Sequence, residues 1–209
     1  MIDIVLGDCL EVMRGYADNQ FDLVLTDPPY GIGEAAGKNK SRTKLGKAKD
    51  YGSLDWDNQI PSKEYFNEMR RISKNQIIFG GNYFAEHLAN SPCWIVWDKD
   101  NTGDFADCEL AWTSFKTAVR KFTHRWNGMI QHDMKNKDYR YHPTQKPLRL
   151  MRWCLSKYAK EGDTILDPFM GSGTTLRAAK DLGFDCVGIE INPDYVKIAQ
   201  DRLKQEVLL

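Results

Sequence analysis

The segment LTDPPYG places a carboxylate, two prolines and a phenol directly after the apolar run FDLVLT. Proline has no backbone N–H, so Pro28 and Pro29 prevent the chain from continuing as a helix or as a central strand. The segment is therefore predicted to be a stiff turn at the end of a buried strand. Ligands of open α/β sheets bind at the carboxyl ends of strands, so we expect Asp27 and Tyr30 to lie beside a ligand.

A second candidate site lies in LDPFMGSGTT, where Asp167 ends a predicted strand and two glycines open a helix. Glycine lets the backbone turn sharply and approach a ligand closely. Glu190 ends the next predicted strand, where its carboxylate can accept hydrogen bonds from both hydroxyls of a ribose. The nicotinamide fingerprint G-x-G-x-x-G is not met, because its third glycine falls on Leu176. The pattern predicts a pocket for a nucleoside without a pyrophosphate; a plain tight turn with a surface glutamate is the alternative.

Three segments, taken together and in order, resemble the signatures of bacterial and phage DNA amino-methyltransferases. TDPPYG resembles their catalytic motif, HPTQKPLRL their third signature, and DPFMGSGTT with GIEINPDYVKIAQDRL their S-adenosylmethionine site. This order is the circularly permuted order of the beta group of the family. The resemblance covers nearly the whole chain. It implies a single α/β catalytic domain over residues 1–209, with a Rossmann-like class I methyltransferase sheet that is mostly parallel with an antiparallel edge.

The resemblance implies an enzyme that methylates an exocyclic amine of a base flipped out of double-stranded DNA. The lone pair of such an amine is delocalised into the ring, so the nitrogen is a poor nucleophile. The Asp27 carboxylate and the Pro28 carbonyl could each accept one amine hydrogen and thereby localise the lone pair. Pro29 keeps the turn rigid and Tyr30 offers a ring for the base, so these four residues are the predicted catalytic set. In the beta group an aspartate at the first motif position goes more often with adenine, so adenine N6 is the expected target and cytosine N4 the alternative.

The resemblance also assigns the pocket of the expected cofactor, S-adenosylmethionine. Asp8 ends the first predicted strand, where the family places an acid on the adenine amine, and Cys9 follows it. Thr144 and Lys146 match positions near the methionine carboxylate, whose charge Lys146 could neutralise. The predicted cofactor-binding residues are Asp8, Cys9, Asp27, Thr144, Lys146, Asp167, Pro168, Phe169, Gly171, Ser172, Gly173, Thr174, Glu190 and Ile191.

Contacts to DNA are expected from a flexible basic loop over residues 31–53, which has almost no large apolar side chains. Six cations of this loop are predicted to contact phosphates: Lys38, Lys40, Arg42, Lys44, Lys47 and Lys49. A merely solvated loop is the alternative. Residues 127–141 form the candidate target-recognition segment, which is short for this family. A second patch is expected to interleave cations and aromatic rings, namely Lys116, Arg120, Lys121, Arg125, Phe122 and Trp126.

Bulk composition narrows the class of protein without choosing a function. The 209 residues suffice for one well-buried domain, and equal numbers of acidic and basic residues give zero net charge. The five scattered cysteines form no C-x-x-C pair, which argues against a zinc ribbon, a redox motif or a disulfide scaffold. No metal site is predicted. No apolar run reaches the roughly 20 residues needed to span a membrane, and the N-terminus lacks a signal-peptide core, so a cytoplasmic protein is expected.

The elements that must position these residues follow from hydrophobic periodicity. Strands are predicted at residues 2–8, 21–27, 75–81, 93–99, 108–114, 117–126, 163–169 and 185–191. Helices are predicted at residues 9–17, 61–74, 82–89, 147–159, 174–183 and 193–204. The first two strands are apolar on both faces, which is typical of central parallel strands. The helix at 147–159 is expected to bury positions 148, 151, 155 and 158.

Other functions compete with this interpretation. Cytosine C5-methyltransferases use a Pro-Cys nucleophile, and this chain contains Pro92-Cys93, but that pair leads into an apolar strand far from the glycine turn. A non-catalytic, cofactor-sensing DNA-binding protein and a nicotinamide oxidoreductase are further alternatives; the intact DPPY argues against the first and Leu176 against the second. The resemblance also raises two partners, a second copy of the chain and a companion restriction endonuclease.

Overall fold

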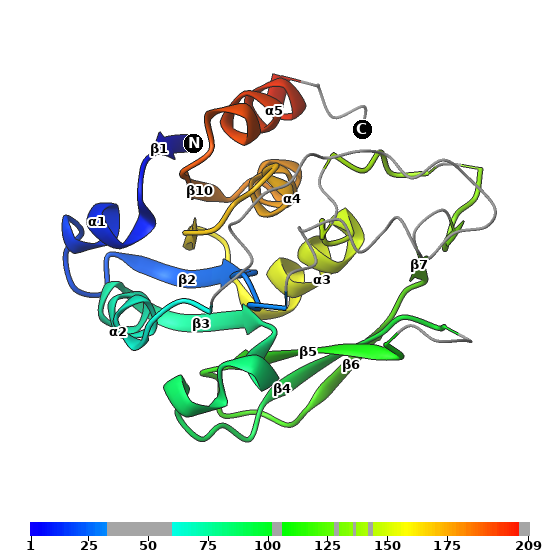
Figure 1. The fold of residues 1–209 in the computed structure, drawn as a ribbon, viewed down its shortest axis with the longest axis horizontal. Helices are drawn as coiled ribbons and strands as arrows, with labels where there is room; N and C mark the ends of the chain where they lie inside the picture. Colours follow the sequence, from blue (N-terminus) through cyan, green and yellow to red (C-terminus); the bar gives the residue numbers. More distant parts are fainter. Residues whose placement is uncertain (33–59, 102–105, 128–129, 136, 142–143, 205–209) are drawn as a thin grey trace.

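The computed structural model describes residues 1–32, 60–101, 106–127, 130–135, 137–141 and 144–204. Figure 1 draws these residues in colour. The six cations predicted to contact DNA, Lys38 through Lys49, lie outside the described residues. The basic loop prediction is therefore not tested by the fold.

An eight-stranded sheet forms the centre of the molecule, with the strand order β1-β10-β9-β2-β3-β5-β4-β6 (Figure 1). Its strands are β1 (Ile2–Leu6), β2 (Phe21–Thr26), β3 (Ser73–Phe79), β4 (Trp94–Asp98), β5 (Cys108–Thr113), β6 (Arg120–Thr123), β9 (Thr164–Asp167) and β10 (Asp185–Glu190). A separate antiparallel ribbon joins β7 (Trp126–Asn127) to β8 (Ile130–Gln131). The single strand predicted at residues 117–126 is thus divided between β6 and β7.

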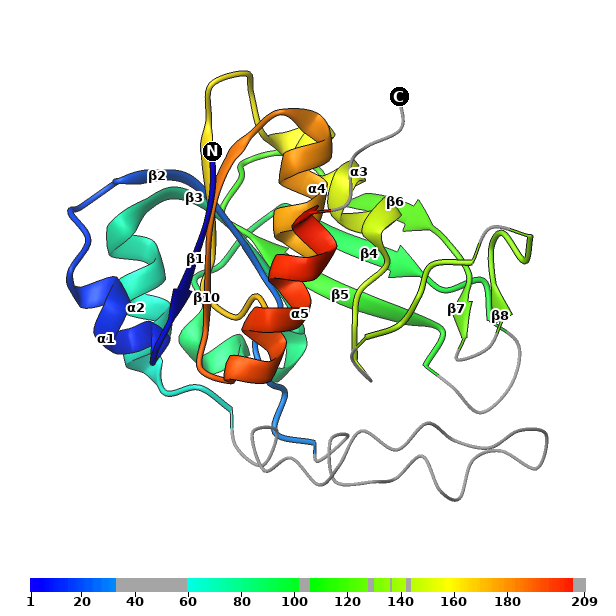
Figure 2. The same ribbon diagram turned by 90° about the horizontal axis from the view of Figure 1, so that it is seen from above.

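Helices cover both faces of the sheet, which gives the three-layer arrangement of an α/β protein. On one face lie α1 (Cys9–Arg14) and α2 (Lys63–Ile72). On the other lie α3 (Leu148–Tyr158), α4 (Thr174–Leu182) and α5 (Pro193–Lys204), as Figure 2 shows from above. The helix predicted at residues 82–89 is wrong in type, because that segment forms two 3-10 turns, η4 (Gly81–Tyr83) and η5 (Ala85–His87). The predicted helix is only eight residues long, and the chain forms two short 3-10 turns there in place of one continuous α-helix.

The predicted α/β sheet, mostly parallel, is confirmed, but the antiparallel strand that was predicted at an edge lies inside the sheet. The antiparallel strand is β5, which pairs antiparallel with both β3 and β4. It lies inside the sheet, because the outermost strand on that side, β6, runs parallel to β4. The first and tenth strands pair along their whole length, from Ile2 opposite Cys186 to Leu6 opposite Glu190. The amino-terminal strand therefore completes a sheet that the carboxyl-terminal third begins, as a circularly permuted order requires.

The prediction that the first strand is central is wrong, because β1 is the outermost strand of the sheet. Ile2 and Ile4 nevertheless pack against the hydrophobic cluster of one face and Val5 against that of the other. An edge strand covered by helices on both faces has the same apolar sequence as a central strand, so composition cannot distinguish them. Leu6, at the end of β1, remains 56% exposed.

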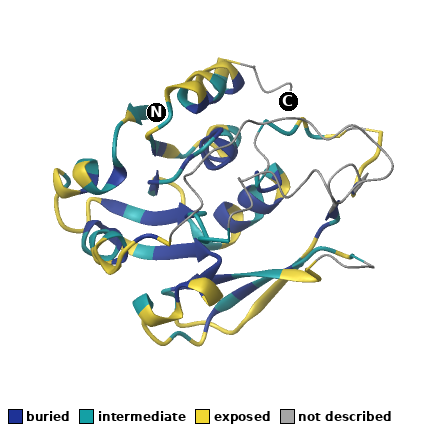
Figure 3. Cartoon of the chain, viewed as in Figure 1, coloured by how far each residue is buried: buried dark blue, intermediate teal, exposed yellow. Residues whose placement is uncertain are grey.

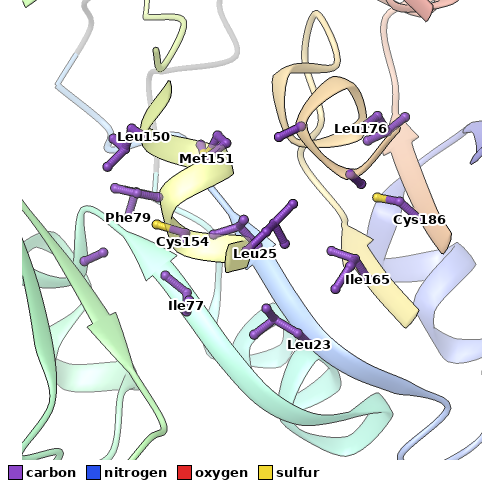
Figure 4. Packing of buried hydrophobic residues seen from close by; sticks show 14 of the residues in the cluster. Leu23, Leu25, Ile77, Phe79, Leu150, Met151, Cys154, Ile165, Leu176 and Cys186 are labelled. Atoms are coloured by element: carbon purple, nitrogen blue, oxygen red, sulfur yellow. The ribbon is translucent and has the colours of Figure 1, made fainter. Parts of the chain in front are cut away.

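The core lies between the sheet and its helices, where Figure 3 shows the buried residues. Leu23, Leu25, Ile77 and Phe79 of the two central strands lie beside α3 (Figure 4). The buried face of α3 differs in part from the expectation: Met151 and Leu155 are buried as predicted, but Leu150 and Cys154 are buried in place of Leu148 and Tyr158. These side chains fix α3, and with it the segment that precedes α3, against the middle of the sheet.

The strand order brings four acidic residues to one edge of the sheet. The strands β1, β10, β9 and β2 are adjacent and parallel, so their carboxyl ends meet there. Asp167 and Glu190 are the last residues of β9 and β10, whereas Asp27 follows β2 directly and Asp8 follows β1 after one glycine. The same edge receives the amino end of β5, because that strand is reversed.

Leu155→Ala tests whether α3 is fixed to the sheet as described. Leu155 is fully buried, so the change leaves a cavity and should lower the free energy of unfolding by about 2–5 kcal/mol. Denaturant-induced unfolding measures this loss. The matched change at the neighbouring exposed Ser156, Ser156→Ala, should stay within about 0.5 kcal/mol of the unmodified protein. Equal losses in both variants would contradict the packing of α3.

Candidate active site

The Asp27 carboxylate is the centre of the candidate site. Its Oδ2 accepts a hydrogen bond from Lys146 Nζ at 2.7 Å, and its Oδ1 accepts one from the Tyr30 hydroxyl at 2.6 Å. The Asp27 side chain is 20% exposed. Pro28 is buried and Pro29 is half-buried, which keeps the backbone after Asp27 in a fixed, extended turn. The predicted catalytic residues thus form one constellation.

The Tyr30 ring is more enclosed than expected for a residue that stacks on a base. It lies 4.9 Å from the ring of Tyr83 in a stacked arrangement and 5.9 Å from that of Phe84 edge-on. Gly80, with φ +72°, approaches the ring so closely that a Cβ there would lie 2.2 Å from Tyr30 Cε1. Tyr30 therefore positions Asp27 through its hydroxyl. Tyr83, which is 43% exposed, presents an aromatic surface next to it.

Lys146, predicted near the methionine carboxylate, pairs with two carboxylates of the protein itself. Its ammonium lies 2.7 Å from Asp27 and 3.1 Å from Glu109, and its side chain is 5% exposed. Glu109 in turn pairs with Lys99 at 2.5 Å. Lys146 directly precedes Pro147, which caps α3, so the packing of that helix delivers the ammonium to the end of β2. The prediction that Lys146 lies near the methionine carboxylate stays a prediction, and the structure adds that two nearby half-buried carboxylates, one of them not identified in the sequence, hold its charge.

Burial and pairing compete in setting the charges of this group. Burial raises the pKa of Asp27, and the adjacent Lys146 ammonium opposes that rise. Burial also acts on Glu109, but Lys146 and Lys99 outweigh it and lower the pKa of that carboxyl. Burial alone would lower the pKa of Lys146, yet the two carboxylates raise it. Lys146 and Glu109 are therefore charged at neutral pH, and Lys146 is the neighbour that most favours the charged form of Asp27.

The glycine turn is joined to the catalytic turn through Asp167. The Thr26 hydroxyl donates to Asp167 Oδ1 at 2.7 Å, and the backbone N–H of Phe169 donates to the same oxygen at 3.1 Å. Asp167 is buried, and this burial raises its pKa to about 6. Because Thr26 is the last residue of β2, the two predicted motifs share one hydrogen-bonded core at the ends of neighbouring strands.

Glu190 and the glycine turn form a second, more open part of the site. Glu190 accepts hydrogen bonds from the backbone N–H of Gly171 at 3.0 Å and of Asn192 at 2.8 Å. The backbone N–H of Ile191 also donates to this carboxylate, so at least one of its roughly four acceptor positions remains for a ribose hydroxyl. Gly171 has φ +50°, and a Cβ there would meet no atom within 4 Å. Ile191, beside Glu190, is 65% exposed.

These features fit an adenine nucleoside. Exposed apolar side chains, Leu6 and Ile191, end the two strands next to the carboxylate, where a planar ring could lie. Asp8 Oδ1 accepts hydrogen bonds from the backbone N–H groups of Leu10 and Glu11, so it caps α1 in addition to its predicted role. Cys9 beside it is buried, and burial raises the pKa of its thiol, so it remains protonated.

The remaining predicted cofactor residues surround the start of α4. Pro168, Ser172, Gly173 and Thr174 are buried, whereas Phe169 and Thr144 are half-buried. Arg202 of α5 donates to the Ser172 carbonyl at 2.6 Å and to the hydroxyls of Ser172 and Thr174 at 3.0 and 3.3 Å. A Cβ on Gly173 would lie 2.8 Å from Ala199 Cβ of the same helix. These residues shape the turn from behind, and Gly171 with Phe169 form its accessible side.

Three contributing residues were not identified in the sequence. Glu109 lies in an unremarkable strand, CELAWT, and only the reversal of β5 brings it to the site. Gln145 is buried and accepts from the Tyr141 N–H at 2.9 Å, which fixes the segment before Lys146. Arg202 lies in a helix whose charged residues are otherwise exposed. Gln145 could have been identified from its place inside the HPTQKP motif. The contributions of Glu109 and Arg202 depend on tertiary structure.

The structure contradicts one further sequence hypothesis, the second patch, and agrees with the argument against a nucleophilic Cys93. The second patch is wrong in its aromatic part, because Phe122 packs on Trp153 at 5.2 Å and the buried Trp126 donates to the Gln145 carbonyl at 3.1 Å. The cations Lys121 and Arg125 pair with acidic residues of neighbouring segments. Cys93 is buried at the amino end of β4, the opposite edge of the sheet from Asp27, which disfavours a nucleophilic role.

The predicted target-recognition segment, 127–141, is held together by side-chain hydrogen bonds in its described part. Gln131 in β8 exchanges two hydrogen bonds with the backbone of Asp138, at 2.8 and 2.9 Å.

Among the residues that the structure describes, no three metal-ligating side chains lie together. No helix within the described ranges has the length and apolar character to cross a membrane.

Comparisons with known proteins agree with this geometry. A family model described as DNA methylase matches residues 94–201, more than half of the chain. The type II methyltransferase M.HpaI of Haemophilus parainfluenzae is 25% identical over 97% of this chain and 74% of its own length. M2.DpnII of Streptococcus pneumoniae is 27% identical over 97% of this chain and 90% of its own. The chain therefore belongs to this family of DNA amino-methyltransferases.

Solved structures support the same fold. The M1.HpyAVI–SAM complex matches with a TM-score of 0.60 and 24% identity, over 98% of this chain and all of that one. The cytosine-N4-specific PvuII DNA methyltransferase matches with a TM-score of 0.64 and 16% identity, over all of this chain and 88% of that one. The class I methyltransferase fold predicted from the sequence is confirmed.

Asp167→Asn tests the buried carboxyl that joins the two motifs. Burial raises the pKa of Asp167 to about 6, against a value near 4 in an unfolded chain. The folded protein therefore keeps this proton between these values, so its stabilising effect is complete below pH ~4 and lost as the pH rises through ~6. The stability of Asp167→Asn relative to the unmodified protein should rise by about 3 kcal/mol from pH 4 to pH 7. Unfolding titrations at several pH values measure this.

The control for that experiment is Glu161→Gln, a change at an exposed acid outside the site. Its stability should follow the pH dependence of the unmodified protein. If Asp167→Asn also followed it, Asp167 would not be the buried titrating group described above.

Proposed function

We propose that this chain is an S-adenosylmethionine-dependent DNA methyltransferase that methylates adenine N6 of a base flipped out of double-stranded DNA. One observation carries the proposal. A rigid Asp-Pro-Pro turn places an ion-paired carboxylate at the same sheet edge as a glycine turn and Glu190. Membership of the DNA amino-methyltransferase family supports the reaction class.

The chemistry assigned to the protein is positioning and electrostatics. Asp27 would accept one hydrogen of the exocyclic amine and the Pro28 carbonyl the other, which localises the nitrogen lone pair. S-adenosylmethionine, when bound, supplies a methyl group on a positively charged sulfur. The amine nitrogen would gain the methyl group as the sulfur–methyl bond breaks, which would leave a neutral thioether, and it would lose one proton to the Asp27 carboxylate. Asp27 takes part as an anion, which the neighbouring Lys146 favours.

The proposed cofactor pocket keeps the predicted residues with one change. Glu190 would bind the ribose, Leu6 and Ile191 would flank the adenine, and Gly171 would leave room for the chain that joins ribose to sulfur. Lys146 is assigned to Asp27 and Glu109. The amino-acid end of the cofactor is then left to Thr144 and to the turn before α4.

Adenine is proposed over cytosine because Asp27, and not serine, opens the catalytic motif. The comparisons include a cytosine-N4-specific enzyme among the similar structures, so cytosine N4 remains the second candidate. Both bases present an exocyclic amine to the same pair of acceptors. A non-catalytic DNA-binding protein is the third, and the complete catalytic constellation argues against it.

Double-stranded DNA is the proposed substrate, with the basic loop at residues 31–53 and the segment 127–141 as its contacts. Since the relatives are named type II methyltransferases, we include a companion restriction endonuclease and a homodimer in the proposal. A DNA substrate also places the reaction in the cytoplasm. The unmodified protein mixed with each candidate partner would test these associations by co-sedimentation.

The direct test of the proposal is incubation with methyl-labelled cofactor and mixed-sequence double-stranded DNA, followed by nucleoside digestion and mass spectrometry. N6-methyladenine would support the full proposal. N4-methylcytosine would retain the mechanism and overturn the choice of base. Cofactor binding without any methylated nucleoside would favour the non-catalytic alternative.

Asp27→Ala should reduce methyl transfer by about 10³-fold or more, because it removes one of the two acceptors for the amine. Cofactor affinity, measured by equilibrium dialysis, should stay within about threefold, since the proposed ribose contact through Glu190 is retained. Asp22→Ala is the matched control, because Asp22 lies at the opposite end of the same strand and pairs with Lys74. Near-normal turnover by Asp27→Ala would refute the catalytic assignment.

A further inference from the structure

Four charged residues of alternating sign form a continuous row that ends at the catalytic turn. Asp27 pairs with Lys146 at 2.7 Å, Lys146 with Glu109 at 3.1 Å, and Glu109 with Lys99 at 2.5 Å. Their side chains are between 5% and 22% exposed. The row begins next to the proposed position of the target base and leads away from it along the sheet edge.

Each member comes from a different element. Asp27 follows β2, Lys146 precedes α3, Glu109 is the second residue of β5, and Lys99 follows β4. Removing charges from water is costly, and well-packed apolar residues often stabilise a fold as well as a buried ion pair does. Four segments of the chain bring paired charges to the catalytic turn. This convergence indicates that the pairs set the charge of Asp27.

A pair made of Asp27 and Lys146 alone would serve the reaction poorly. The ammonium keeps the carboxylate ionised, but an ammonium that pairs with a single carboxylate also cancels its charge and competes with the amine for its oxygens. Glu109 changes this balance, because it attracts the same ammonium from a second direction. Lys99 pairs with Glu109 and holds it there.

We propose that Lys146 keeps the Asp27 carboxylate ionised and that Glu109, by sharing the Lys146 ammonium, preserves the negative charge with which Asp27 accepts the amine hydrogen. Both are positioning residues, since they act through Asp27 and not on the base. The inference rests on the proposed function above, and it adds a role for two residues outside the cofactor pocket.

Other titratable groups also face Asp27. The Tyr30 hydroxyl donates to Oδ1, and the Asp27 charge contributes to the raised pKa of the nearby Asp167 carboxyl. Tyr83 stacks on Tyr30 from the surface. These groups remain in both variants below, so differences between the variants report on Lys146 and Glu109.

The test compares pH–rate profiles of methyl transfer for Lys146→Met and Glu109→Gln. Removing the cation should raise the pKa of Asp27, which moves the acid limb of the profile to higher pH by about 1–3 units. Removing the anion should lower it, which moves the acid limb to lower pH by about one unit. Glu109→Gln should also lower the plateau rate about tenfold with little change in KM. A purely structural role predicts lower rates in both variants with no opposite movement of the limbs.

Two controls accompany the profiles. Lys146→Arg keeps the positive charge and should leave the acid limb near its original position. Lys74→Met removes a cation that pairs with Asp22 at the far end of β2, and it should move nothing. If Lys146→Met does not fold, Glu109→Gln against Lys74→Met decides the result.

A second readout does not depend on catalysis. Carbon-13 NMR can follow the Asp27 carboxyl in the ligand-free protein, with its signal assigned by its loss in Asp27→Asn. The midpoint should rise in Lys146→Met and fall in Glu109→Gln. Opposite shifts with no methyl transfer by the unmodified protein would refute the proposed function and keep the charge arrangement. Unchanged midpoints, or shifts in the same direction, would overturn the inference even if the enzyme is active.

Discussion

The Lys146 ammonium, held between the carboxylates of Asp27 and Glu109, is the interaction on which the arrangement of the site depends. A buried ammonium needs anionic partners, and here two carboxylates lie within 3.1 Å of it. The catalytic turn, the start of α3 and the reversed strand β5 therefore have to meet at one point. Gln145 and the packing of Leu150, Met151 and Leu155 hold the lysine side of this meeting in place.

The topology of the sheet supplies the other side. Four adjacent parallel strands end in or just before acidic residues, which gathers Asp8, Asp27, Asp167 and Glu190 at one edge. Burial raises the pKa of Asp167 to about 6, so Asp167 adds little negative charge below that pH, and the Lys146 ammonium offsets the charge of Asp27. The two halves of the site therefore differ. The half around Gly171 and Glu190 is open, as a nucleoside pocket requires, and the half around Asp27 is enclosed, as a catalytic turn requires.

Local sequence signals predicted most of this structure, because they depend on residues that are close in the chain. The strand–turn–helix at Asp167 to Thr174 and the Asn192-Pro193 helix start follow from backbone chemistry alone. The edge position of β1 and the contribution of Glu109 could not be predicted in this way. Both depend on which strands are adjacent and on the direction in which each strand runs. The sequence CELAWT is compatible with either a parallel or an antiparallel β5. Lys146 was identified from its motif, but its ion pairs with Asp27 and Glu109 were not, because they depend on where β5 lies.

The most direct measurement is a crystal structure of the protein with S-adenosylhomocysteine and a DNA duplex that contains the methylated sequence. The account predicts that Lys146 Nζ stays between Asp27 and Glu109, and that the exocyclic amine of the flipped base lies within hydrogen-bond distance of the Asp27 carboxylate and the Pro28 carbonyl. A structure in which Lys146 has left Asp27 to pair with the carboxylate of the cofactor would contradict it.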